Sequence, residues 1–146
     1  MSADAVTLAD ITSADWSLML DATAGGGPGS GIGRVVQGIA DVDQCIGIIL
    51  TTPLGSDPLR PTFGCDIWQF VDAPVNTAGP GVVSAVTQAI MQWEPRVTVL
   101  SVQSQPVADA ATQPGAHLSV TVSWQLNLGA ASGPAGVTTV SVASGG

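Results

Sequence analysis

One stretch near the C-terminal end of the chain alternates strictly between apolar and polar residues. A Ser, Thr, Gln or Asn separates each successive pair of its apolar residues, which are Leu118, Val120, Val122, Trp124, Leu126 and Leu128. Side chains of a β-strand point alternately to opposite faces of a sheet, so this pattern predicts a strand with one buried and one solvated face. Such a strand requires neighbouring strands and a layer that covers its apolar face.

Two further segments have the composition of strands. Val97–Val102 is β-branched and mostly apolar on both faces, and Val137–Val142 forms a third run. Residues 129–136 lie between the alternating stretch and Val137–Val142. They contain glycines, small residues and Pro134, which predicts a long hairpin loop. The sequence therefore predicts an antiparallel sheet of about three strands.

A helix is predicted from Asp41 to Thr52. Its apolar residues recur with helical spacing on one face and are Val42, Cys45, Ile46, Ile49 and Leu50. Asp41 can cap the start of this helix, and Gln44 three residues later completes a capping-box pattern. Pro53 disfavours helical geometry in the preceding residue and predicts that the helix ends at Thr52.

A second helix is predicted from Pro80 to Trp93. Proline suits the first position of a helix, and Pro95 ends the pattern. The expected buried stripe consists of Val82, Val86, Ala89, Ile90 and Trp93. Between the two helices, residues 52–64 carry enough prolines and glycines to predict a loop of fixed shape, and residues 65–70 a short helix.

This order of elements predicts an α+β fold, in which two main helices pack on one face of a small antiparallel sheet. The glycine-rich run 25–33 separates residues 1–32, an irregular N-terminal segment with its linker, from a single domain over residues 33–146. The segment can add a hairpin by pairing Trp16–Leu20 with Arg34–Gln37.

The composition points to a surface that partners cover. Charged residues make up 10% of the 146 residues, against a usual share of about 25%, and hydrophobic residues make up 45%. The net charge is −8, the cations are three arginines, and lysine is absent. Binding to nucleic acid or to an anionic membrane is therefore disfavoured, because both depend on several cationic side chains.

The remaining sequence features predict a protein that is made and kept in the cytoplasm. The first ten residues lack the basic and apolar regions of a secretory signal, and no apolar run reaches the 18 residues that a membrane span needs. Cys45 and Cys65 are too few for a disulfide framework. Both are expected to be thiols with structural roles.

The sequence contains no pattern that holds a metal or a cofactor. His117 is the single histidine and starts the alternating strand, and the cysteines have no zinc spacing. The glycine run 25–33 matches no phosphate-binding motif. Glycoside hydrolysis needs two carboxyl groups about 5–9.5 Å apart, and the carboxylates in or near the central loops are Asp57, Asp66, Asp72 and Glu94. Backbone capping accounts for such residues more simply, so no catalytic residue is predicted.

The turn Trp93-Glu94-Pro95-Arg96 has two interpretations. Glu94 is the only glutamate of the chain, and Arg96 is one of its three cations. The two side chains can form a local ion pair at the corner between helix and strand. Alternatively Glu94, Arg96 and Arg60 are held rigidly, so that the guanidinium groups meet carboxylates or carbonyls of a partner.

Several motifs together resemble the baseplate wedge and sheath-initiator family of contractile tails, which is often described as lysozyme-like and has a relative in type VI secretion baseplates. The resemblance covers residues 33–128 and rests on the long alternating strand and on Asp43–Ile46, Leu50–Gly55, Leu59–Ile67 and Trp93–Val97. The chain departs from many family members in having Ser56, Asp57 and Pro58 where they have a more charged stretch, and in lacking lysine.

The resemblance implies a structural subunit of the tail baseplate, assembled in the host cytoplasm and present in about six copies per virion. Its partners would be wedge proteins and the tail sheath protein, which would share a strand with the edge of the sheet. The residues expected to contact partners are Glu94, Pro95, Arg96, Arg60, Trp93 and Phe63. The alternatives are a peptidoglycan-cleaving baseplate enzyme and a small regulatory binding module of the same fold.

Overall fold

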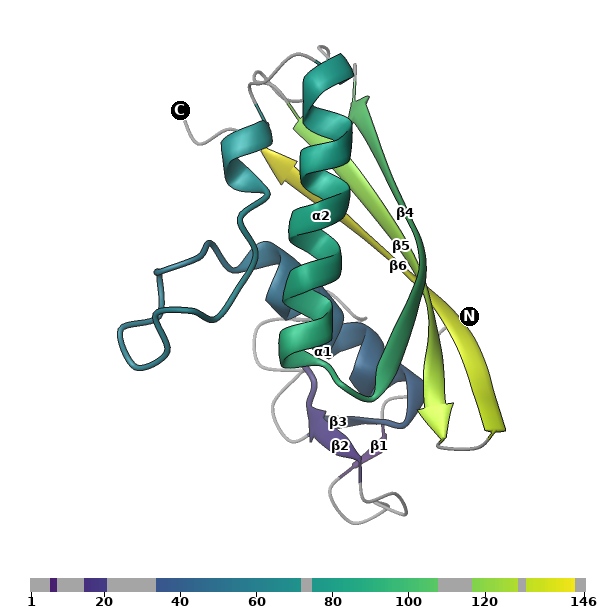
Figure 1. The fold of residues 1–146 in the computed structure, drawn as a ribbon. Helices are drawn as coiled ribbons and strands as arrows, with labels where there is room; N and C mark the ends of the chain where they lie inside the picture. Colours follow the sequence, from purple (N-terminus) through teal and green to yellow (C-terminus); the bar gives the residue numbers. More distant parts are fainter. Residues whose placement is uncertain are drawn as a thin grey trace. The chain divides into compact units, whose positions relative to one another are not determined.

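The computed structural model describes residues 6–7, 15–20, 34–71, 75–107, 117–128 and 131–143. It confirms the α+β fold class, with helices and antiparallel sheets (Figure 1). The chain divides into two compact units, an N-terminal unit of Met1–Cys45 and a C-terminal unit of Ile46–Gly146. The domain boundary predicted at residue 33 stays a prediction.

The N-terminal unit contains a three-stranded antiparallel sheet. Its strand order is β1 (Val6–Thr7), β3 (Arg34–Gln37), β2 (Trp16–Leu18). The predicted hairpin is confirmed, since β2 pairs with β3 along its whole length. The two residues of β1 were too few to predict from the sequence. The glycine-rich run 25–33 lies outside the described residues.

Helix α1 (Ile39–Thr51) starts two residues before the predicted position. Gly38 has a φ of +59°, a conformation that glycine adopts readily, and its carbonyl accepts a hydrogen bond from Val42 N at 3.2 Å. The chain therefore turns from β3 directly into the helix. Asp41 is consequently a buried residue of the first turn and not the cap, so the capping prediction was wrong.

Gln44 forms hydrogen bonds with residues in and directly after strand β2 of the N-terminal sheet and not the predicted capping box. Its Oε1 accepts a hydrogen bond from Leu20 N at 3.0 Å, and its Nε2 donates to Leu18 O at 2.7 Å and to Ser17 Oγ at 2.9 Å. The side chain thus fixes the end of β2 to the helix. The apolar stripe predicted for α1 has four buried members, Val42, Ile46, Ile49 and Leu50, and Cys45 is half-buried.

Helix α2 (Val75–Trp93) begins five residues before the predicted start and ends at the predicted residue. Pro80 lies inside the helix and not at its first position. A proline has helical φ but removes one backbone hydrogen bond inside a helix, so the extension before Pro80 departs from the rule that placed the start there. The predicted stripe is buried at Val82, Val86, Ala89 and Ile90, and Trp93 is half-buried.

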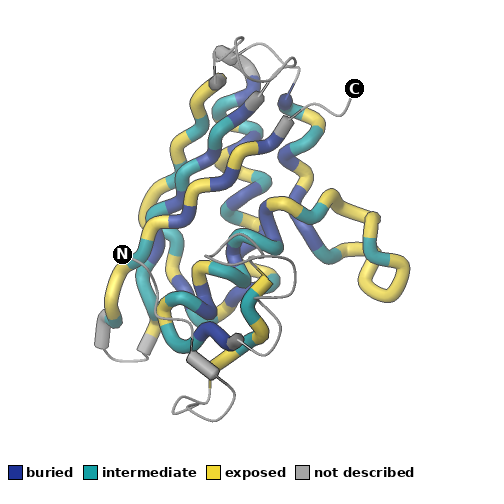
Figure 2. Tube along the Cα trace, turned by 180° about the vertical axis from the view of Figure 1, so that it is seen from behind, coloured by how far each residue is buried: buried dark blue, intermediate teal, exposed yellow. Residues whose placement is uncertain are grey.

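The C-terminal sheet has the order β4 (Val97–Val107), β5 (His117–Leu128), β6 (Ala131–Ala143), with both pairs antiparallel. Helix α2 packs against this sheet (Figure 1). The predicted alternation along the central strand is confirmed, because burial alternates along it (Figure 2). Strand β4 is five residues longer than predicted.

The prediction of a long loop over residues 129–136 was wrong, because β6 already begins at Ala131. The glycine at position 136 has a packing role within the strand. A Cβ there would lie 2.4 Å from Cζ2 of Trp124, so the indole ring rests directly on the Gly136 backbone. Trp124 is fully buried, and its Nε1 donates a hydrogen bond to Thr138 Oγ1 at 2.8 Å.

Candidate functional site

Residues 52–64 of the C-terminal unit form the predicted loop of fixed shape. Its base is closed by a hydrogen bond of 2.9 Å from Cys65 N to Thr52 O. Gly64 has a φ of +108°, and a Cβ on it would lie 2.3 Å from Thr52 O. Only glycine fits this crossing of two backbone segments. The short helix expected over 65–70 is a single turn, η2 (Trp68–Phe70).

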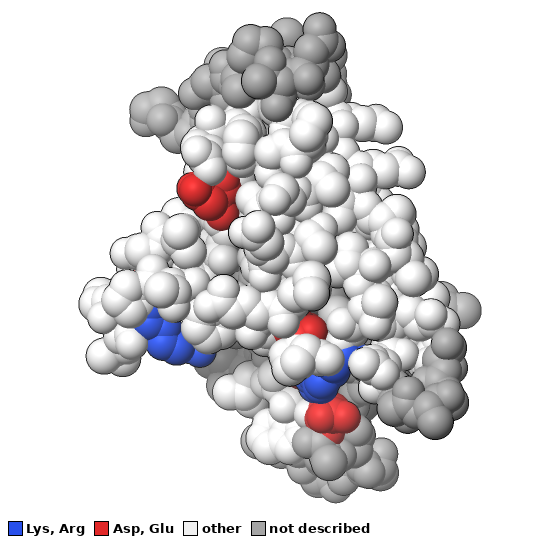
Figure 3. Space-filling model, viewed as in Figure 1, with Lys and Arg blue, Asp and Glu red and all other residues white. Residues whose placement is uncertain are grey.

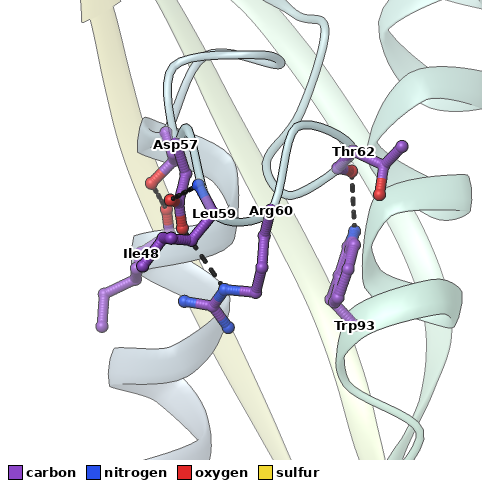
Figure 4. A network of polar contacts seen from close by, with 7 residues as sticks. Ile48, Asp57, Leu59, Arg60, Thr62 and Trp93 are labelled. Atoms are coloured by element: carbon purple, nitrogen blue, oxygen red, sulfur yellow. Dashed lines mark hydrogen bonds and ion pairs between the residues drawn. The ribbon is translucent and has the colours of Figure 1, made fainter.

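The tip of the loop is organised by Asp57. Its Oδ1 accepts a hydrogen bond from Leu59 N at 2.9 Å, and its Oδ2 accepts one from Arg60 Nε at 3.3 Å (Figure 4). The Leu59 N–H contributes most to lowering the pKa of Asp57, and Arg60 lowers that pKa further against a desolvation effect that raises it. The carboxylate thus holds both the turn and the guanidinium group.

Arg60, Phe63 and Trp93 form a stack that joins the loop to the end of α2. The guanidinium carbon of Arg60 lies 4.6 Å from the centroid of the Phe63 ring. The Phe63 and Trp93 rings meet edge to face, with centroids 5.2 Å apart and an interplanar angle of 73°. Trp93 Nε1 also donates a hydrogen bond to Thr62 O at 3.2 Å (Figure 4).

The corner after Trp93 contains a bidentate ion pair. Arg96 donates from Nε to Oε1 of Glu94 at 2.6 Å and from Nη2 to Oε2 at 2.8 Å. Glu94 is buried, with 4% of its surface exposed. The backbone of the corner is held as well, because Val97 N donates to Glu94 O at 3.3 Å and Asn127 N donates to Arg96 O at 2.7 Å. The local pair is therefore present, and Arg96 is positioned by it.

The six residues predicted to contact partners lie in one unit and form two adjoining groups. Trp93 connects them, since it completes the stack with Phe63 and Arg60 and directly precedes Glu94, Pro95 and Arg96. Sequence reasoning missed Leu59, whose side chain is 92% exposed at the tip of the loop. The available signal was a leucine between two prolines in a loop of fixed shape.

A pocket of about 400 Å³ lies between the loop, η2 and α2. Amide and hydroxyl side chains dominate its polar lining, which includes Ser84, Gln88 and Gln92 from one side of α2. Asp66 is the only carboxylate among the described lining residues, and it accepts a hydrogen bond from Gln69 Nε2 at 2.6 Å. Asp57 and Glu94 are engaged by arginines outside this lining, and Asp72 lies outside the described residues.

The thiol of Cys65 is buried beneath the same pocket, and desolvation raises its pKa from 9.0 to about 11. Stability that depends on the neutral thiol is fully present below pH 9 and is lost as the pH approaches 11. The chain has no lysine or tyrosine that would titrate in this window. We expect the urea midpoint of unfolding to fall between pH 9 and pH 11. In the Cys65→Ala variant most of this fall should disappear. An undiminished fall would show that ionisation of the Cys65 thiol does not cause it.

Other features of the described chain concern metals, membranes and charge. Among residues with described positions, no group of three or more His, Cys, Asp or Glu side chains is placed to hold a metal ion. No helix within these ranges is both long and apolar enough to span a bilayer. Acidic and basic side chains occupy only a few separate places on the face drawn in Figure 3.

The sequence of this chain is similar to those of known baseplate proteins. The profile of the family described as baseplate wedge protein gp25 matches residues 36–130. Baseplate protein W of Escherichia phage P2 is 32% identical over 96 residues, which cover 65% of this chain and 78% of that protein.

Two solved structures also contain chains that are similar to this one. A putative tail lysozyme from Geobacter sulfurreducens aligns with 68% of this chain and 86% of its own, with 30% identity and a TM-score of 0.53. The baseplate of postcontracted pyocin R2 contains a chain that is 26% identical, with a TM-score of 0.49 and coverage of 78% of this chain and 93% of that one.

Proposed function

The chain belongs to the baseplate wedge protein gp25 family, and we propose that it is a structural subunit of a contractile tail baseplate that links wedge proteins and starts the tail sheath. The observation that carries this function is the rigid pair of arginines. Arg60 forms an ion pair with Asp57 and lies over the Phe63 ring, and Arg96 is hydrogen-bonded to the buried Glu94. Groups held in advance lose little conformational entropy when a partner binds.

The wedge contact of this proposal is the corner Trp93–Arg96 together with the stack. Arg96 retains 32% side-chain exposure and Arg60 retains 59%, so both reach the surface. Planar guanidinium groups recognise carboxylates and main-chain carbonyls with defined geometry. Phe63 and Trp93 add partly buried aromatic surface beside them, which is the composition of interface hot spots.

The sheath contact of this proposal is an edge of the C-terminal sheet. Strands β4 and β6 are the outer strands of the order β4-β5-β6. Both pairings contain one register shift, and the longer regular stretch belongs to β6, over Ala135–Ala143 against Ser101–Val107 in β4. A regular outer strand offers an unbroken row of backbone groups to an added strand, which favours the edge of β6 for strand sharing.

The enzymatic alternative is motivated by the relative described as a putative tail lysozyme. Cleavage of a glycosidic bond needs a general acid and a second carboxylate across one cleft. In the described part of the chain, Asp66 is alone in its pocket lining, and Glu94 is buried against Arg96. We therefore propose a function without turnover. Clearing of peptidoglycan by the purified chain would contradict it.

Replacing Arg96 with alanine is expected to reduce co-purification with the wedge proteins at least tenfold. The variant loses the guanidinium group and leaves the Glu94 carboxylate without its bidentate donor. The free energy of unfolding should fall by about 3–5 kcal/mol, and circular dichroism of the isolated variant measures whether it remains folded. Affinity purification of tagged wedge proteins and electron microscopy of sheathed tails provide the measurements.

The matched control separates lost binding from lost stability. The double variant Glu94→Leu and Arg96→Met replaces both partners with apolar side chains and leaves no buried polar group of the pair without a partner, so it should be close to the wild type in stability. Its co-purification should still be reduced as strongly as that of Arg96→Ala. Normal wedge binding and normal sheath assembly by the double variant would refute the proposed wedge contact.

A further inference from the structure

The tip of the loop 52–64 presents one apolar side chain to solvent. Leu59 is 92% exposed, the highest value among the large hydrophobic residues of the described chain. The flanking Pro58 and Pro61 are exposed as well. Figures 1 and 2 show the loop projecting from the rest of the C-terminal unit, with most of its residues exposed.

Hydrogen bonds hold this leucine in a defined position. Leu59 N donates to the Asp57 carboxylate at 2.9 Å, and Arg60 N donates to Asp57 O at 3.2 Å. Phe63 N donates to Arg60 O at 2.9 Å, which closes the next turn. The loop is thus tied at its tip, along its length and, through Thr52 and Cys65, at its base. A preorganised apolar side chain binds at low entropic cost.

The neighbouring residue defines the chemistry of the partner. Arg60 is 59% exposed at its side chain, and in the described structure it donates to Asp57 through Nε alone. Its Nη groups are therefore oriented by the Phe63 ring but directed to no acceptor of the described chain. A surface that receives Leu59 must be apolar at its centre and must carry an acceptor, best a carboxylate, at its rim.

We propose that Leu59 is an anchor side chain that inserts into an apolar socket of another baseplate protein, with a carboxylate of that protein at the rim bound by Arg60. This inference rests on the proposed function, because it places the socket within the baseplate. It adds a binding residue outside the corner Trp93–Arg96.

The first test replaces Leu59 in cells that assemble the particle. Leu59→Asp is expected to lower incorporation into purified baseplates at least tenfold, whereas Leu59→Met should retain it. Leu59 has almost no contacts to lose, so the variants should fold. Met91→Asp, at a 67% exposed position on α2, is the matched control and should incorporate normally. Normal incorporation of Leu59→Asp, or equal loss with Met91→Asp, would overturn the proposal.

The second test measures whether position 59 is covered in the assembled baseplate. A Leu59→Cys variant in a Cys45→Ala background should react with maleimide at least tenfold more slowly in assembled baseplates than in the isolated chain. Cys65 contributes no background at pH 7, because it is buried and its pKa is about 11. Equal reaction rates, or a cross-link from position 59 to another copy of this chain, would reject the socket. Absence of the wild-type chain from baseplates would instead refute the proposed function.

Discussion

Replacing Gly136 with alanine is expected to lower the free energy of unfolding by about 3 kcal/mol. The added Cβ would lie 2.4 Å from Cζ2 and 2.7 Å from Cη2 of Trp124. Trp124 cannot move aside easily, because it is fully buried and its Nε1 is bonded to Thr138 Oγ1. Either the indole leaves its hydrogen bond or β6 separates from β5. Urea denaturation followed by circular dichroism measures the change.

The Gly136→Ala effect can be assigned to the indole by a double-mutant cycle. In a Trp124→Phe background the outer part of the indole is absent, so the added penalty of Gly136→Ala should fall below about 1 kcal/mol. Gly47→Ala is the control within helix α1, where a Cβ meets no atom within 4 Å and should stabilise by up to about 1 kcal/mol. Equal penalties in both Trp124 backgrounds would show that the contact is not responsible.

The Gly64→Ala variant is expected to lose about 3 kcal/mol of stability, and it should also lose the ordered loop. A φ of +108° is strained for alanine, and its Cβ would meet Thr52 O at 2.3 Å. That oxygen accepts the hydrogen bond from Cys65 N which closes the loop. Displacing the closure moves the segment that carries Phe63. Wedge binding should therefore fall together with stability, as measured by urea denaturation and co-purification.

Gly55→Ala separates backbone strain from the steric clash. Gly55 also has a positive φ, of +82°, but the nearest atom to its Cβ is Pro61 O at 4.0 Å. This variant should cost about 1 kcal/mol and retain wedge binding. If Gly55→Ala and Gly64→Ala reduced stability equally, the crossing of Gly64 over Thr52 would not be what secures the loop.

Helix ends were predictable where a single local cause decides them. Pro53 and Pro95 end the two helices within one residue of the predicted positions. The starts were less predictable, because each depends on the preceding segment. Gly38 connects α1 directly to a strand, and α2 extends through Pro80. A proline inside a helix loses one hydrogen bond and crowds the carbonyl four residues earlier, so the local sequence favoured a start at Pro80 and not the start that the structure shows.

The candidate site was predictable by residue type but not by arrangement. Composition made Arg60, Glu94 and Arg96 conspicuous, since charged residues are rare in this chain. The pairing of Glu94 with Arg96 was one of two open interpretations, and only the structure shows the bidentate geometry. The exposed Leu59 was not predicted, because an apolar residue in a loop can be buried or exposed with the same local sequence.

The sequence by itself determined the α+β class, the central strand of the C-terminal sheet and the family, because residue periodicity and motif order are local properties. Tertiary structure alone decided that β6 continues through Gly136, since Trp124 from the neighbouring strand occupies the space of the missing side chain. It also decided which of the candidate partner-binding residues lie together at the surface. The stack of Arg60, Phe63 and Trp93 joins residues about thirty positions apart, and such contacts depend on the packing of the whole unit.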